Sequence, residues 1–176
     1  MKPIFIIVLC MFSLMPLWSQ QNTSDPILDL QQQDILGNGN DAYIQQIGNG
    51  NNAEINQLQR GDRLLNNAAI IQEGDNNSAT VAQRGKGNQA LVIQSGNNNS
   101  YDLLLTGRRN NIYVSQQGDG NSILQRLRGF VGVDVEFIQV GNNNSITQDL
   151  NGVSDQAFQI TQRGNGLQLQ ITVDGN

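Results

Sequence analysis

The chain has 176 residues, of which 5% are aromatic and 14% charged, and its formal net charge is −5. This length is enough for one domain. Large apolar side chains are sparse and evenly scattered, which excludes a conventional packed core. Two architectures remain, a disordered polar chain or a repeat array that buries polar residues in ladders. The modest negative charge does not by itself indicate nucleic-acid binding.

The first 19 residues have the pattern of a signal peptide. Lys2 supplies the positive charge, residues 4–17 form an apolar run, and Ser19 is a small residue at the cleavage site. The run is too short to span a bilayer comfortably. The single cysteine, Cys10, would suit a lipoprotein, but Leu9 before it is too bulky for that processing site. We therefore expect residues 1–19 to be removed, leaving a mature chain without a thiol or disulfide.

Glycine recurs from Gly37 to Gly175 at a spacing of 11 residues, with four intervals of 12 or 13. The third, fifth, seventh and ninth residues after each glycine tend to be Asn, a small or branched apolar residue, an aliphatic residue and Gln. A spacing of two places these residues on one face of a strand, whereas a helix would scatter them. Gly and Asn both tolerate the positive φ of turns. The predicted turn glycines are Gly48, Gly61, Gly74, Gly85, Gly96, Gly107, Gly118, Gly129 and Gly141.

An 11-residue strand and turn cannot bury its own inward face, so the units must stack. Two units make a coil of about 22 residues, and the next coil lies roughly 4.8 Å away. The sequence thus predicts an all-β, amyloid-like solenoid of about six coils, with two strands per coil, over residues 37–176. A disordered linker is the alternative, but disorder does not require aliphatic residues at a fixed phase.

Polar residues can occupy such an interior because stacked amides satisfy one another as donors and acceptors. Transfer of an isolated amide from water to an apolar interior would cost roughly 2–7 kcal/mol of free energy. The predicted ladder residues are Asn40, Gln46, Asn51, Gln57, Gln72, Asn77, Gln83, Asn88, Gln94, Asn99, Asn110, Gln116, Asn121, Gln139, Asn144 and Gln162. Aliphatic residues from Ile44 to Val114 are expected to run between the amide columns.

The phased amides resemble the curlin repeat family, the subunits of curli amyloid fibres, whose pattern is Q-x4-N-x5-Q. Residues 46–57, 72–83 and 83–94 match this pattern strictly. The resemblance implies an extracellular, cell-surface fibre that serves biofilm and adhesion. It also implies export through an outer-membrane pore and assembly with other copies or a second curlin subunit. Residues 20–36 occupy the place of the family's N-terminal targeting segment.

The chain departs from the family pattern in its second half. Leu105, Leu127 and Leu150 replace Gln. Residues larger or less polar than the pattern requires stand at Val133, Phe137, Leu167 and Val173. The family has a major subunit and a minor, nucleating subunit with less regular and more basic repeats. This chain has features of the minor one, and both assignments stay open.

Basic residues gather at one edge of the predicted solenoid. They are Arg60, Arg63, Arg84, Lys86, Arg108, Arg109, Arg126 and Arg128. Like charges one strand apart repel each other, and an anionic partner such as lipopolysaccharide or extracellular DNA would relieve this repulsion. The alternative is that these cations are gatekeepers, which slow self-pairing during export. Both interpretations remain open.

The sequence offers no recognisable catalytic constellation. It contains no His, and its carboxylates are scattered, so we expect neither an enzyme nor a cofactor, metal or small-molecule substrate site. Gly-Asp pairs such as Gly74-Asp75 suggest a calcium β-roll, but the nonapeptide period is missing. The main rival to a fibre subunit is a non-fibrous secreted repeat adhesin that binds anionic polymers through the basic edge.

Overall fold

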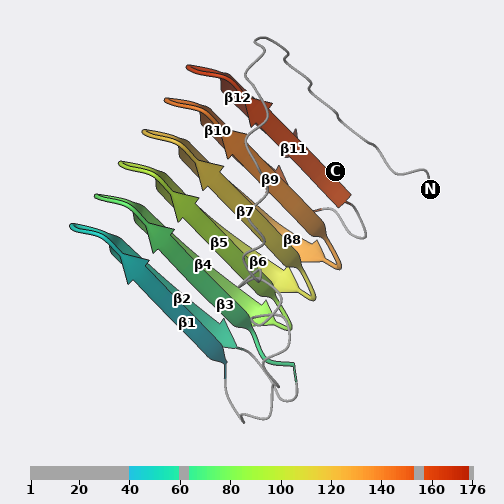
Figure 1. Ribbon diagram of the computed structural model, residues 1–176. Coiled ribbons are helices and arrows are strands. Elements are labelled where there is room, and N and C mark those ends of the chain that lie inside the picture. The colour runs from blue at the N-terminus through green and yellow to red at the C-terminus, as the bar shows by residue number, and fades with distance from the viewer. Residues whose placement is uncertain (1–39, 60–63, 153–156, 175–176) are drawn as a thin grey trace, which may run out of the picture.

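The computed structural model describes residues 40–59, 64–152 and 157–174. These residues form twelve strands and no helix (Figure 1). The strands are β1 (Asp41–Ile47), β2 (Asn52–Gln59), β3 (Asn67–Glu73), β4 (Ser78–Lys86), β5 (Gln89–Ser95), β6 (Ser100–Arg108), β7 (Asn111–Gln117), β8 (Ser122–Val131), β9 (Asp134–Val140), β10 (Ser145–Asn151), β11 (Ala157–Arg163) and β12 (Gln168–Asp174).

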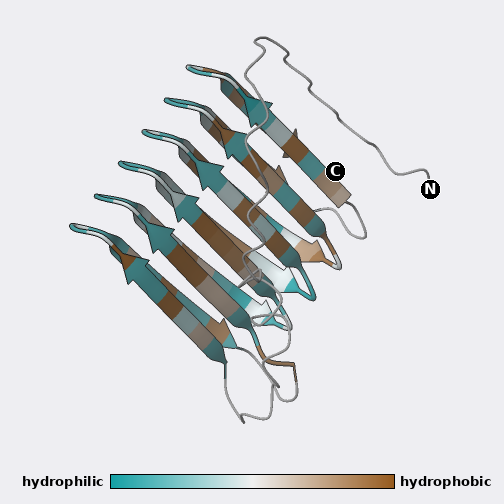
Figure 2. Ribbon diagram, viewed as in Figure 1, coloured by the Kyte–Doolittle hydropathy of each residue, from teal (hydrophilic) through white to brown (hydrophobic). Residues whose placement is uncertain are grey.

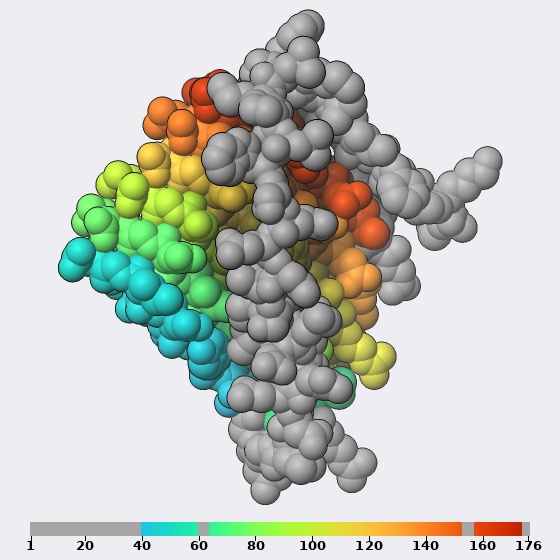
Figure 3. Space-filling view, in the orientation of Figure 1, coloured from blue at the N-terminus to red at the C-terminus, as the bar shows by residue number. Residues whose placement is uncertain are grey.

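Odd- and even-numbered strands form two separate parallel sheets. Sheet A has the order β1-β3-β5-β7-β9-β11, and sheet B has the order β12-β10-β8-β6-β4-β2. The chain crosses from one sheet to the other at every turn, so each pair of consecutive strands is one coil. Figure 3 shows the coils as successive layers from blue to red. The predicted β-solenoid of six two-strand coils is confirmed.

The coil length differs from the predicted 22 residues in part of the stack. Equivalent Gln side chains of sheet A are separated by 26, 22, 22, 23 and 23 residues. In the longest coil Gln59 pairs with Gly85, and Asn66 lies beside Asn88. The additional residues therefore lie between Gln59 and Asn66. Stacking tolerates this insertion because the pairing of β2 with β4 before it and of β3 with β5 after it is regular.

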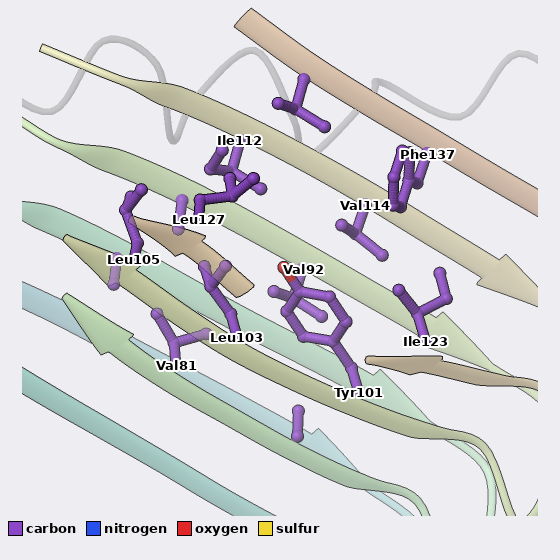
Figure 4. Packing of buried hydrophobic residues seen from close by; sticks show 14 of the residues in the cluster. Val81, Val92, Tyr101, Leu103, Leu105, Ile112, Val114, Ile123, Leu127 and Phe137 are labelled. Carbon is purple, nitrogen blue, oxygen red and sulfur yellow. The ribbon is translucent and has the colours of Figure 1, made fainter. Parts of the chain in front are cut away.

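Alternate residues of each strand point between the two sheets. In β6, Tyr101, Leu103 and Leu105 are at most 1% exposed, whereas the residues between them face outward. Ile70, Val81, Val92 and Val114 are fully buried in the same core, as the two-residue period predicts. Figure 4 shows Val81 and Leu103 of sheet B and Val92 and Val114 of sheet A among the side chains that meet in this core, and Figure 2 shows hydrophilic turns flanking more apolar strands. The core is therefore a thin apolar layer bordered by amide columns.

Candidate functional site

A continuous column of glutamines runs along the inside of sheet A. Each Nε2 donates to the Oε1 of the next coil, from Gln46 through Gln72, Gln94, Gln116 and Gln139 to Gln162, at 2.7, 2.8, 2.8, 3.0 and 2.8 Å. Gln94 Nε2 also donates to the Ser78 carbonyl of sheet B, at 3.1 Å. The column therefore links each coil to the next, and its second N–H links the two sheets.

A column of asparagines follows the edge where sheet A passes into sheet B. The Asn77 Oδ1 accepts from the Asn99 backbone N–H at 3.0 Å and from its Nδ2 at 3.1 Å. The Asn77 Nδ2 donates to the Gly96 carbonyl at 2.7 Å. The pattern repeats along Asn51, Asn77, Asn99, Asn121 and Asn144, until Leu167 ends the column.

The opposite edge carries a shorter asparagine column. It consists of Asn40, Asn66, Asn88 and Asn110, and Val133 ends it by donating its backbone N–H to the Asn110 Oδ1 at 3.1 Å. The Gln column of sheet B is shorter still, because Gln57 and Gln83 are followed in register by Leu105. The amide network is thus complete in the first coils and incomplete in the last.

Three interior amides, Asn66, Gln125 and Gln148, were not predicted from the sequence. Asn66 lies in the coil that has additional residues. Its separation from Gly61 in the sequence therefore differs from the regular spacing, and the pattern did not place it in an asparagine column. Gln125 and Gln148 occupy a position where an aliphatic residue was expected, yet both are fully buried. The alternation from Ile123 to Leu127 is the signal that would have identified Gln125.

Tyr101 begins a polar row within the core of sheet B. Its hydroxyl donates to the Gln125 Oε1 at 2.8 Å, and the Gln125 Nε2 donates to the Gln148 Oε1 at 2.8 Å. Burial raises the pKa of Tyr101 well above its usual value, and the nearby charge of Asp102 raises it further. The phenol therefore stays protonated and acts as a donor. Among described residues, the Gln148 Nε2 is the one buried side-chain N or O atom without a hydrogen-bond partner.

A second, external ladder lies at the turns between sheets A and B. The residue after each turn glycine accepts, through its side-chain oxygen, the backbone N–H of the preceding coil. For example, the Asp75 Oδ1 accepts from Asn49 at 2.7 Å, and the Asn97 Oδ1 accepts from Asp75 at 2.9 Å. The row continues through Asp119, Asn142 and Asn165. The recurrence of Asn or Asp after each glycine was the available signal.

The predicted glycines fall into two groups. Gly48, Gly74, Gly96, Gly118 and Gly141 lie in the turns that follow sheet A, whereas Gly85 and Gly107 lie at the ends of β4 and β6. The expected position of Gly129 is wrong, because a register shift pairs Gly107 with Phe130. Gly129 precedes Phe130 inside β8, where the irregularity allows Phe130 to be fully buried. Gly61 lies outside the described residues.

The structure brings four of the eight predicted basic residues together. Lys86 and Arg108 are register partners on neighbouring strands, Arg84 precedes Lys86 by two residues, and Arg109 follows Arg108. Arg84, Arg108 and Arg109 are exposed, and Lys86 is half-buried. We call these four residues the basic ridge.

Two other predicted basic residues, Arg126 and Arg128, lie apart from these four. Arg126 lies in the middle of β8, on the outer face of sheet B between Leu104 and Asp149, so placing it at the edge was wrong. Arg128 forms an ion pair with Asp149 at 3.2 Å. Arg60 and Arg63 lie outside the described residues.

Among the described strands, those of the first and last coils each have a strand neighbour on one side only. β1, β2, β11 and β12 are the edge strands of the two sheets. Ile44 and Val173 occupy inward positions, yet they are 44% and 40% exposed. Their counterparts in the middle coils, such as Ile70 and Leu150, are fully buried. Within the described part of the chain, both ends thus present interior-type side chains on edge strands.

Neither a membrane-spanning helix nor a metal-binding cluster is found in the part of the chain that the structure describes. No helix there is long and apolar enough to cross a membrane. Likewise, those residues include no group of three or more His, Cys, Asp or Glu side chains that could hold a metal ion.

The fold and its ladders define a two-sheet parallel β-solenoid with an amide-rich interior. The curlin associated repeat matches residues 74–103, which run from the turn before β4 into β6. This match confirms the resemblance to the curlin repeat family, and it falls on coils whose Asn and Gln columns are complete or nearly so. No curated protein and no solved structure matches the chain.

Proposed function

We propose that the chain is a secreted structural subunit of extracellular, curli-like amyloid fibres at the cell surface, serving biofilm matrix, cell aggregation and adhesion. The curlin repeat is the hallmark of structural fibre subunits and not of enzymes, which supports this role. In this proposal residues 1–19 are a signal peptide. Residues 20–36 target the chain to an outer-membrane secretion pore, and residues 37–176 form the fibre unit.

The open coil ends are the observation that carries the proposal. Each inner coil is held to its neighbours by parallel backbone pairing and by side-chain hydrogen bonds that repeat coil after coil. At β1 and β11 the backbone pairing stops, and Ile44 is left partly exposed. An unpaired strand edge of this kind recruits another chain. A second copy stacked end to end would continue both sheets and bury these side chains, as in cross-β fibres.

We expect the purified mature chain to be soluble at first and then to form fibres that bind Thioflavin T. The physical reason is that each added copy extends both sheets and the Gln column of sheet A. Sedimentation and electron microscopy over several days check this prediction. A chain that remains monomeric at high concentration would contradict the fibre proposal and favour the non-fibrous adhesin.

The basic ridge supports a second element of the proposal, binding to anionic surface polymers such as lipopolysaccharide or extracellular DNA. Lys86 and Arg108 lie on strands that are neighbours in the sheet, about one strand spacing apart. Their mutual repulsion decreases when a polyanion supplies phosphates along the ridge. The ridge runs along the coil edge, so in a fibre it would recur once per subunit.

Replacing the ridge by neutral residues should abolish salt-sensitive polyanion binding. The variant is Arg84→Gln, Lys86→Gln, Arg108→Gln and Arg109→Asn, since Arg109 has a φ of 57° and Asn adopts this conformation readily at equivalent turns. Binding to lipopolysaccharide and to duplex DNA is measured at low and high salt. The control is Arg126→Gln with Arg163→Gln, which removes cations that lie away from the ridge.

The gatekeeper alternative predicts a different result for the same variant. Gatekeeping cations slow self-pairing, so their removal would accelerate fibre formation and leave polymer binding unchanged. Unchanged binding at low salt would therefore remove polyanion recognition from the proposal. The effect on the fibre lag time then shows whether the ridge slows self-pairing.

A further inference from the structure

The two ends of the solenoid present different chemistry to an incoming coil. The inward residues of the first coil include four amides, Asn40, Gln46, Asn51 and Gln57. Of the described inward residues of the last coil, Gln162 is the one amide, and all the others are apolar. These are Phe158, Ile160, Leu167, Leu169, Ile171 and Val173. We call the two surfaces the amide end and the aliphatic end.

Each kind of hydrogen bond in the columns keeps the same direction from coil to coil. The inner coils therefore show which donors and acceptors the amide end requires from a preceding coil. Each Asn accepts the backbone N–H of the following coil, as Asn51 Oδ1 does from Asn77 at 2.9 Å. Each Gln Oε1 accepts an Nε2 of the preceding coil, as Gln83 does from Gln57 at 3.0 Å. At the amide end, the Asn51 N–H therefore requires an acceptor and the Gln57 Oε1 requires a donor from the preceding coil.

The chain's own aliphatic end supplies neither group. If a second copy stacked its β12 on β2, the register would place Leu167 against Asn51 and Val173 against Gln57. The Asn51 N–H and the Gln57 Oε1 would then be buried without partners. In sheet A, by contrast, Gln162 would meet Gln46 and extend the Gln column. Copy-to-copy stacking would continue the Gln column of sheet A, but it would leave two polar groups unsatisfied in sheet B.

A mismatch of the opposite order, in which an amide precedes an aliphatic residue, occurs inside the chain at the last coil. Gln148 of β10 pairs in register with Ile171 of β12, and the Gln148 Nε2 is buried without a hydrogen-bond partner. An amide column that meets an aliphatic residue of β12 therefore does leave an orphaned donor in this fold. Such orphaned groups are among the more costly features of a buried interface.

We propose that the amide end is a templating end, whose preferred occupant is a different chain. That chain is a second curlin-type subunit whose terminal coil carries Asn where this chain has Leu167 and Gln where it has Val173. The inference rests on the proposed stacking of coils into fibres and adds to it a partner and a polarity. The aliphatic end discriminates against continued growth by identical copies.

A variant of this chain serves as the probe for such a partner. Leu167→Asn and Val173→Gln together restore the amides of the last coil. The new Asn would accept hydrogen bonds as Asn144 does, and the new Gln would occupy the position that Gln83 has in β4. Thr172→Gln is the matched control, because Thr172 lies on the same strand but on its outward side, in register with Asp149. The two single variants are made as well, so that one of them remains if the double variant folds poorly.

Two measurements test the inference. The first is the concentration of free chain left when fibre formation ends. We expect the double variant to lower this residual concentration at least tenfold relative to the wild type, since satisfying one buried polar group is worth about a factor of ten in affinity. Thr172→Gln should leave the residual concentration unchanged. The second is two-colour microscopy of labelled variant added to short wild-type fibres. We expect many of the wild-type fibres to extend at one end only. The fraction that extends at one end only should be smaller when fibres of the variant are used as seeds.

The possible outcomes separate the inference from the fibre proposal. Fibres from both chains with equal residual concentrations and equal extension at both ends would overturn the inference and leave the fibre proposal intact. Fibres from the variant but none from the wild type would support the inference and contradict self-assembly of the wild-type chain. Absence of fibres from every chain would contradict both.

Discussion

Gln94→Glu is expected to destabilise the central coils by about 3–5 kcal/mol and to prevent fibre formation, because it buries an unpaired charge. Gln94 is fully buried, and its Nε2 donates to Gln116 Oε1 at 2.8 Å and to the Ser78 carbonyl at 3.1 Å. A carboxylate there would face two acceptors without a proton to donate. Chemical denaturation followed by circular dichroism, together with sedimentation of fibres, measures the effect.

Gln89→Glu is the matched control for this substitution. Gln89 lies on the same strand, β5, but it is exposed, so the same chemical change should leave stability and assembly nearly unchanged. Acidification provides an internal check. Burial raises the pKa of a carboxyl, so the Gln94→Glu variant should regain stability as the pH falls below that raised pKa and lose it as the pH rises through it. Equal loss in both variants would contradict the assigned direction of the side chains.

Gly85→Ala should destabilise the solenoid by about 3 kcal/mol, through backbone strain and displacement of the next coil. Gly85 has a φ of 124°, which side-chain-bearing residues rarely adopt. A Cβ at this position would overlap the carbonyl oxygen of Gly107 on the neighbouring coil. The parallel pairing of β4 with β6 would have to open at this point. Thermal unfolding of the soluble chain and the rate of fibre formation both report the effect.

Gly87→Asn is the control two residues away. Gly87 also has a positive φ, of 68°, but the nearest atom to an added Cβ is the Leu64 Cβ at 3.4 Å. Arg109 holds the equivalent position in the next coil with a φ of 57°. Asn tolerates this left-handed conformation, so the substitution should cost little. If Gly87→Asn proved as damaging as Gly85→Ala, close packing against Gly107 would not be the reason that glycine is required at position 85.

Much of the fold could be predicted because one rule, the two-residue alternation, governs every strand. It correctly placed Leu103 and Val114 in the core. The errors arose where residues are inserted. The register shift at Gly129 and the additional residues between Gln59 and Asn66 both shift the phase at an edge, which periodicity within strands cannot reveal.

The chemistry of the columns was harder to predict than their existence. A residue such as Gln148 fits the alternation. Its Nε2 lacks a hydrogen-bond partner because the residue in register on the next coil is Ile171, which the alternation alone does not reveal. The external ladder of Asp75 and Asn97 also depends on contacts between coils, since each side chain accepts from the backbone of the preceding turn. Such contacts become predictable only when the register of the whole stack is known.

The mass per unit length of the fibres tests directly whether the six-coil solenoid is the unit that stacks. If the six coils stack end to end, one chain should advance the fibre axis by six strand spacings, about 29 Å at roughly 4.8 Å each. Scanning transmission electron microscopy gives this quantity for unstained fibres, and fibre diffraction gives the strand spacing along the axis. We expect one chain per about 29 Å of each protofilament. One chain per about 4.8 Å would mean that every chain forms a single flat layer, and it would contradict the solenoid as the unit of assembly.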